Sequence, residues 1–139
     1  MEPTEIFETS PFMNHLNISL LEASDGYVEA ELEATDELLS VAGGQVLQGG
    51  VVASLADGIA GLAVGEAVQG LTPTIDIRVD YLRPPTTDLR AQAEVTYIGA
   101  SVGRADVEVS GTDGALVATA RAIYKVGEEP DETPWTAID

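Results

Sequence analysis

The sequence predicts an α+β domain in which a curved antiparallel sheet wraps around one long, buried helix. An almost entirely apolar run from 49 to 65 predicts the helix, because a helix that is apolar on every side is usually a central one. Segments with period-two alternation predict six strands around it. One helix cannot cover both faces of so large a sheet, so we expect strong curvature, and self-association at the remaining face and edge.

Two strands are predicted before the long helix. Residues 3–15 predict a short acidic helical segment that Pro11 interrupts. Residues 18–22 and 27–34 predict strands, and the turn signal at 24–26 joins them as a hairpin. The second strand alternates strictly, which predicts one buried face and one acidic solvent face formed by Glu29, Glu31 and Glu33.

The central helix is expected to follow a connection at 35–48 that contains two glycines. It begins near Gly49 and fades around 64–66. Glycines inside a helix cost about 1 kcal/mol each relative to alanine, so those at 58, 61 and 65 predict a helix pressed against neighbouring backbone.

Four more strands are predicted after Gly70, as a meander over residues 74–82, 89–98, 104–110 and 115–126. Alternation in the first of them predicts a shared face for Ile75, Ile77, Val79 and Tyr81. The elements together predict one domain over 1–126, followed by an acidic tail at 127–139 that we expect to be mobile.

The charge of the chain is strongly negative, at −18, with six basic residues against 24 acidic ones. This balance argues against nucleic-acid binding through phosphates. An acidic disordered chain would lack apolar residues, whereas 45% of this chain is apolar. The acidity therefore predicts a surface adapted to high salt, with a fold or oligomer that weakens in dilute buffer.

The cellular compartment is predicted from three features that the sequence lacks, namely cysteine, a signal peptide and a membrane span. The chain has no cysteine, which excludes disulfides, thiolate metal sites and a cysteine nucleophile. The first ten residues hold three glutamates and no basic residue, so no signal peptide is expected. The run at 49–65 is shorter than a membrane span, which needs about 20 residues, and it holds an acidic residue near its centre. A soluble, cytoplasmic protein is expected.

Asp57 is the most informative residue, because it is one of only two polar residues in the apolar run. A buried carboxylate is costly unless it is paired, hydrogen-bonded or neutralised. Two interpretations stay open: Asp57 is a functional carboxylate, or it lies on a solvent-exposed stripe of the helix. Ser54, the other polar residue, is expected to be a packing hydroxyl, and His15, the single histidine, a surface residue.

This layout, with the segment QGGVVASLAD at 48–57, resembles the hotdog-fold acyl-CoA thioesterases. It is most similar to the branch with the phenylacetate-pathway and human acyl-CoA thioesterase 13-like enzymes. That branch has His-Gly-Gly at the helix start and an acid nine positions after the His, where this chain has Gln48 and Asp57. The segments TIDIRVDYLRP at 74–84, GR at 103–104 and GALVA at 114–118 also match, so the resemblance spans about residues 10–126.

The resemblance implies hydrolysis of an acyl-CoA by a homodimer or dimer of dimers, with sites at the subunit interface and no metal or other cofactor. Asp57 would be general base or nucleophile, and the Gly49 N–H an oxyanion donor. Gly50 would leave room for substrate, and Thr74 would orient water. From the residues alone, close packing of the glycines and an ordinary strand threonine remain alternatives.

Two departures keep a second function open. The family often has Asn where this chain has Ala42, and Gln48 replaces the family His, although its amide can still bind an oxygen. A non-hydrolytic module that binds acyl-CoA or another apolar ligand is therefore the alternative.

All six basic residues lie between 78 and 125, where six acids balance them. Arg83, Arg90 and Arg104 are predicted to bind the phosphates of coenzyme A, because guanidinium suits phosphate geometry. Surface ion pairs are the alternative.

Overall fold

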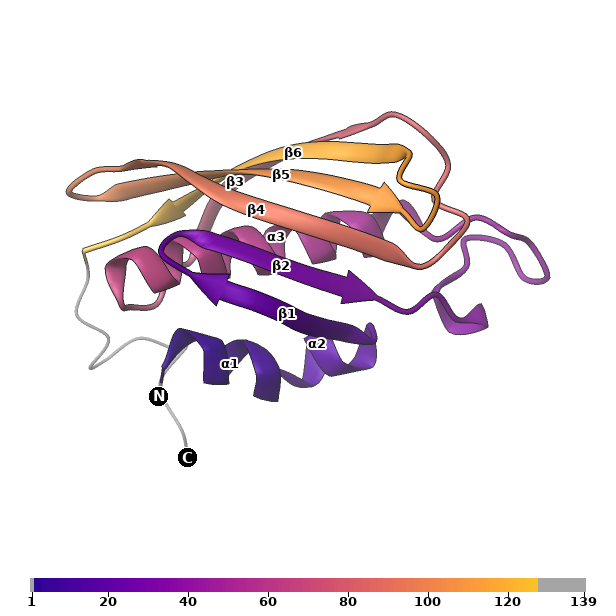
Figure 1. Ribbon diagram of the computed structural model, residues 1–139, viewed down its shortest axis with the longest axis horizontal. Coiled ribbons are helices and arrows are strands. Elements are labelled where there is room, and N and C mark those ends of the chain that lie inside the picture. Colours follow the sequence, from indigo (N-terminus) through magenta and orange to yellow (C-terminus); the bar gives the residue numbers. More distant parts are fainter. Residues whose placement is uncertain (1, 128–139) are drawn as a thin grey trace.

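A six-stranded antiparallel sheet curves around one long helix in the computed structural model, which describes residues 2–127 (Figure 1). The strand order is β1-β2-β4-β5-β6-β3. The elements are α1 (Pro3–Thr9), α2 (Pro11–His15), β1 (Ile18–Ser24), β2 (Tyr27–Leu32), the 3-10 helix η1 (Asp36–Leu38), α3 (Gly49–Val68), β3 (Thr74–Tyr81), β4 (Leu89–Ile98), β5 (Val102–Gly111) and β6 (Leu116–Lys125). The predicted α+β class and the curved sheet around a central helix are confirmed. Of the tail expected at 127–139, all but Gly127 lies outside the described residues.

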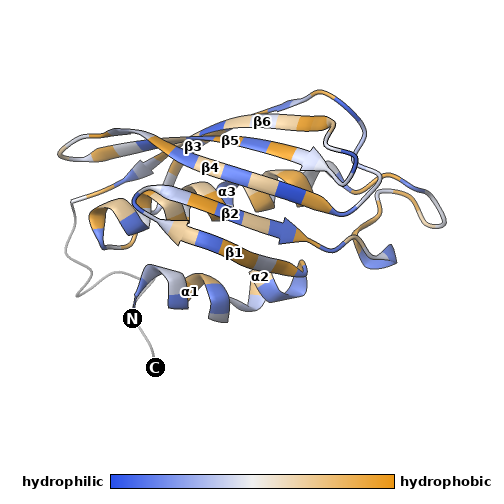
Figure 2. Cartoon of the chain, viewed as in Figure 1, coloured by the Kyte–Doolittle hydropathy of each residue, from blue (hydrophilic) through white to orange (hydrophobic). Residues whose placement is uncertain are grey.

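The alternation of the strands separates a buried face from a polar face. Small side chains dominate the face toward α3, so the helix can lie close to the sheet; those fully buried are Ala30, Ala91, Ala93, Ala105, Ala118 and Ala122. Charged residues occupy the opposite face, and the resulting alternation of colours is visible along β2 and β4 in Figure 2.

Helix α3 is buried on most sides, as its apolar sequence predicts. It begins after Gln48, whose side-chain oxygen accepts a hydrogen bond from the Gly50 N–H, and ends at Gln69 in the left-handed conformation. By length and composition alone this helix could cross a membrane, but here it is the core helix, and most of it lies inside the domain.

The predicted meander is wrong at its first strand, because β3 pairs with β6 rather than with β4. The segment between β3 and β4 contains Pro84 and Pro85 and is too long for a tight hairpin turn. It carries the chain across the sheet, where β4 pairs with β2 over Leu89–Glu94. Strand β3 is consequently an edge strand.

A bulge at the start of β3 also corrects the predicted face of that strand. Thr74 pairs with Tyr124 and Asp76 with Ile123, so β3 advances by two residues where β6 advances by one. The extra residue, Ile75, is 56% exposed, and Thr74 takes the inward position that alternation had given to Ile75.

The N-terminal helices lie beside α3 and β1, broken at Pro11 as predicted. Ser10 caps α2 by accepting from the Met13 N–H, and Phe7 packs into the core. The Thr4 hydroxyl donates to the Glu66 carboxylate, which ties α1 to the end of α3.

Candidate active site

Asp57 lies in the middle of α3, partly exposed, with one carboxylate oxygen held by two hydroxyl groups. Thr74 Oγ1 donates to Asp57 Oδ1 over 2.9 Å, and the Tyr124 hydroxyl lies 2.9 Å from the same oxygen. The other oxygen, Oδ2, has no hydrogen-bond partner among the described residues. This carboxylate is therefore fixed through one oxygen and available through the other.

Tyr124 is a member of this cluster that we did not predict. It occupies an inward position of β6 and is 1% exposed, and its hydroxyl also lies 2.7 Å from the Asp57 carbonyl oxygen. An aromatic residue in an alternating strand normally indicates core packing, so nothing in the sequence distinguished this one. Burial, and then the neighbouring Asp57 carboxylate, raises the pKa of the Tyr124 phenol well above its ordinary value.

An apolar groove of about 250 Å³ begins at this cluster. Its floor is the face of α3 that carries Gly58, Gly61 and Leu62, and its walls come from α1, α2 and residues 70–74. Glycine at 58 leaves space that the tip of Met13 occupies, because an added Cβ would lie 2.9 Å from the Met13 sulfur. The groove joins a carboxylate to an apolar surface, as a site for an amphipathic ligand requires.

The start of α3 forms a second candidate region. The Gly49 N–H has no acceptor among the described residues, whereas the Gly50 N–H donates to Gln48 Oε1 over 3.2 Å. The Tyr81 hydroxyl, also not predicted, donates to the Gly49 carbonyl over 2.6 Å, and its ring lies against this glycine. Free N–H groups at a helix start, with the helix dipole behind them, favour a negatively charged atom.

The two regions do not meet within one chain. Asp57 lies eight residues after Gly49 on the same helix, which at the rise of an α-helix separates them by about 12 Å. A single reacting carbonyl cannot reach both.

The three candidate arginines differ in their surroundings. Arg90 and Arg104 lie on the sheet face opposite α3, where Arg90 pairs with Glu29 and Glu31, and Arg104 Nε donates to the Thr96 hydroxyl. Arg83 follows β3, is exposed, and its side chain has no partner among the described residues. It lines a hollow of about 420 Å³ that Gly49 also lines. Arg83 is thus the arginine that shares a hollow with the helix start.

Other candidates form no side-chain hydrogen bond with Asp57 within residues 2–127. Ala42 is exposed in the loop before α3, and His15 is exposed at the end of α2. Ser54 makes no hydrogen bond through its hydroxyl within residues 2–127. A larger hollow, of about 970 Å³, lies near the ends of β1, β2, β4 and β5 and is lined by none of the predicted catalytic residues. Residues 2–127 contain no group of three or more His, Asp or Glu that could hold a metal ion.

Comparison with known proteins shows the family of this chain. Residues 44–118 match the Thioesterase superfamily, and this match spans the start of α3, Asp57, Thr74 and the candidate arginines. A protein of Halobacterium salinarum, whose name gives only a provisional esterase assignment, is 36% identical over 102 residues, or 70% of this chain and 68% of the relative.

Two further proteins are similar to this chain. The medium/long-chain acyl-CoA thioesterase YigI of Salmonella typhimurium is 31% identical over 133 residues, covering 84% of this chain and 86% of its own. The solved structure of the E. coli PaaI protein, from the phenylacetic acid degradation operon, superposes with a TM-score of 0.80 at 24% identity, covering 89% of this chain and 90% of that one. This last likeness shows the shared fold. The chain belongs to the thioesterase superfamily and has its hotdog fold.

Proposed function

We propose that this protein is an acyl-CoA thioesterase, which hydrolyses an acyl-CoA to a free acid and coenzyme A. The observation that carries the proposal is the Asp57 carboxylate, held through one oxygen at the mouth of an apolar groove. Family membership supports a hydrolase, and the name of the Salmonella relative supports a CoA thioester as the substrate.

The reaction needs a group that accepts a proton from water. In the proposed step, the water oxygen attacks the thioester carbonyl carbon while the water proton moves to Asp57 Oδ2. The carbon–sulfur bond then breaks and coenzyme A leaves as the thiolate. Direct attack by Oδ2 on the same carbon would give a mixed anhydride that water later hydrolyses, and this geometry accommodates that route as well.

The negative charge that develops on the carbonyl oxygen would be stabilised by the Gly49 N–H. Since Gly49 and Asp57 of one chain are about 12 Å apart, one site would combine the Gly49 N–H of one copy with the Asp57 carboxylate of a second copy. The proposed enzyme is therefore active only as a dimer or a higher oligomer.

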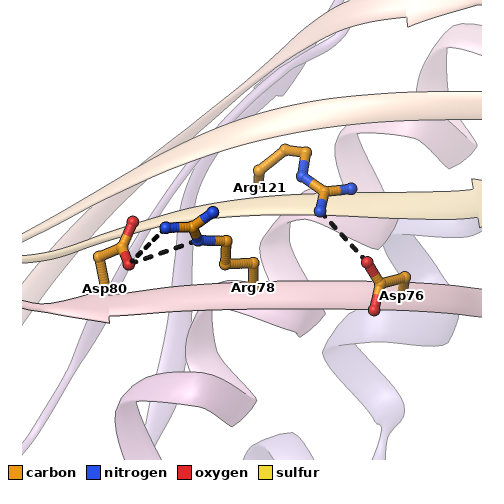
Figure 3. Close-up of polar contacts among 4 residues, drawn as sticks. All are labelled: Asp76, Arg78, Asp80 and Arg121. Atoms are coloured by element: carbon orange, nitrogen blue, oxygen red, sulfur yellow. Dashed lines mark hydrogen bonds and ion pairs between the residues drawn. The ribbon is translucent and has the colours of Figure 1, made fainter.

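Strand β3 is the proposed contact between two copies, because it is an edge strand with unpaired backbone groups. Its outer face alternates Asp76, Arg78 and Asp80, with Arg121 of β6 bound to Asp76 (Figure 3). If the β3 strands of two copies pair in antiparallel fashion, with the two-fold axis at residue 77 or 79, each Arg78 lies opposite an aspartate of the other copy. A pair centred on residue 78 would oppose the two arginines, so we expect one of the first two registers.

The groove beside Asp57 is the proposed site for the acyl group. A cavity of about 150 Å³ is enough to hold benzene, so a groove of about 250 Å³ suits an aryl group or an aliphatic chain of medium length. Arg83 is the candidate for a phosphate of coenzyme A, because its side chain has no partner within residues 2–127 and it shares a hollow with Gly49.

One observation favours the alternative, a module that binds acyl-CoA without cleaving it. Gln48 uses its amide oxygen to cap α3, which leaves only its NH2 group for a substrate oxygen, and Ala42 provides no amide, so one of the two side chains that serve the carbonyl in the family is missing here.

Hydrolysis of a panel of acyl-CoAs, followed with a thiol-detecting dye in molar KCl, separates the two functions. The enzyme should turn over at least one member and lose about 10³-fold or more in kcat on Asp57→Asn, while still binding that acyl-CoA. Asp25→Asn is the matched control, since Asp25 lies in an exposed turn with a positive φ that asparagine tolerates. A folded protein that binds acyl-CoAs but cleaves none would establish the binding module instead.

A further inference from the structure

Tyr124 binds Asp57 at two atoms. Its hydroxyl lies 2.7 Å from the Asp57 carbonyl oxygen and 2.9 Å from Asp57 Oδ1. A phenol has a single proton to donate, and here both candidate acceptors belong to the same residue. The contact therefore links the backbone of Asp57 to its carboxylate and restricts rotation of that side chain.

The surroundings of Tyr124 keep it a donor. The side chain is almost completely buried, and burial together with the adjacent carboxylate raises the pKa of the phenol above its ordinary value. Among the residues that line the groove, Asp57 and Tyr124 are the only titratable groups, because α1, α2 and residues 70–74 contribute apolar side chains, hydroxyls and backbone. The phenol thus stays protonated throughout the neutral pH range.

Helix α3 is shaped to receive this ring. Gly61 lies about one helical turn after Asp57, and a Cβ added there would lie 3.2 Å from Tyr124 Cε1. That separation is tighter than ordinary van der Waals contact, so an alanine at 61 would push the ring. Glycine at this position therefore allows the hydroxyl to reach Asp57.

The two hydroxyl groups beside Oδ1 leave the two carboxylate oxygens in different surroundings. Oδ1 lies within hydrogen-bond distance of Thr74 Oγ1 and the Tyr124 hydroxyl, whereas Oδ2 has no partner within residues 2–127. The hydroxyl groups beside Oδ1 define which oxygen remains to accept a proton.

We propose that Tyr124 is a positioning residue for hydrolysis, which acts through Asp57 by occupying Oδ1 together with Thr74 and leaving Oδ2 as the reactive oxygen. This inference rests on the proposed thioesterase function. Tyr124 itself touches no reacting atom in the proposal, and its effect is on the orientation of the carboxylate.

Tyr124→Phe tests the inference, because it keeps the ring and removes the hydroxyl. The expected result is a fall in kcat of about 10- to 100-fold, the effect of one hydrogen bond to a charged group, with KM changed by less than about threefold. A Tyr124 that only fills space would leave kcat at its native value, because phenylalanine keeps the ring in place.

Tyr97→Phe is the matched control, since Tyr97 lies exposed near the end of β4. Gly61→Ala is a second variant, which retains the hydroxyl but displaces the ring, and alanine favours the helix. It should lower kcat about 2- to 10-fold, so the inference stays testable if Tyr124→Phe folds poorly.

The outcomes separate the two proposals. Native turnover that Asp57→Asn abolishes, together with a native kcat in Tyr124→Phe, would overturn the positioning role alone. A native protein that cleaves no acyl-CoA would overturn the proposed function, and the positioning role with it. Loss of kcat in Tyr124→Phe at a nearly unchanged KM, with native kcat in Tyr97→Phe, supports both.

Discussion

The hydroxyl of Thr74 donates to Asp57 Oδ1 across 2.9 Å, although regular alternation of β3 would have turned Thr74 toward the other face of the sheet. The bulge at Ile75 reverses this, because the extra residue moves every earlier side chain to the opposite face. A local irregularity of one strand thereby provides a partner for the central carboxylate.

Replacing Thr74 by valine should lower kcat about tenfold, because valine keeps the branched shape but removes a hydrogen bond to a charged group. Thr74→Ser keeps the donor and should retain most of the activity. The comparison is made from kcat of the two variants on the best acyl-CoA of the panel. Equal activity of the valine variant and the native enzyme would remove Thr74 from the mechanism.

Met13→Ala should widen the groove, because the Met13 thioether lies against Gly58 at its floor. We expect kcat/KM to shift by about tenfold in favour of longer acyl chains, the usual effect of one or two methylenes in an apolar pocket. Phe12→Ala is the control, since Phe12 is exposed on the same helix and does not line the groove. An unchanged chain-length profile would place the acyl group elsewhere.

Arg78→Glu should weaken self-association, because three acidic residues in alternate positions would then repel the same strand of a second copy. Light scattering coupled to size exclusion at low salt should show a shift toward monomer, with a parallel loss of activity if the site is shared. Arg104→Glu makes the same charge change in β5, an internal strand. Identical behaviour of the two variants would argue against pairing through β3.

Stability should rise with ionic strength, because the chain carries 18 net negative charges. The Debye length falls from about 30 Å at 0.01 M to about 3 Å at 1 M salt, so repulsion between surface carboxylates is largely screened over this range. The Tm measured in increasing KCl should therefore increase, most steeply at the low end. A Tm that is flat in KCl would contradict the salt-adapted surface inferred from composition.

Gln48→Ala should destabilise the domain by about 0.5 to 1 kcal/mol, because it removes the acceptor of the Gly50 N–H at the start of α3. Urea unfolding measures this loss of free energy. Gln45→Ala, in the exposed loop before the helix, is the control and should be close to neutral. A neutral Gln48→Ala would mean that water caps the helix equally well.

The secondary structure was largely predictable, because its signals are local. Proline at 11 separates the two short helices, Gly49 and Gly50 begin α3, and alternation marks the strands. The position of β3 at the edge was not predictable, since pairing with β6 instead of β4 depends on contacts between segments far apart in sequence.

The site was predictable only in part, for a similar reason. Asp57 was identified because a carboxylate is conspicuous in an apolar helix. Tyr81 and Tyr124 were missed, because a tyrosine in an alternating strand has the same pattern whether it fills the core or donates a hydrogen bond. The hydroxyl groups beside the carboxylate come from two strands, β3 and β6, and no periodicity in the sequence indicates that these strands meet at Asp57.

The two edges of the sheet have different shapes, and this difference bears on how the protein avoids growing into fibres. The β1 edge is irregular, with a register shift between Leu20 and Glu22, and α1 and α2 pack against it, whereas β3 is regular from Asp76 to Tyr81. Only one edge thus offers a straight ladder, and two copies joined there would leave none for a third. Salt screens charge but leaves strand geometry unchanged, so this protection would persist where repulsion between copies fades.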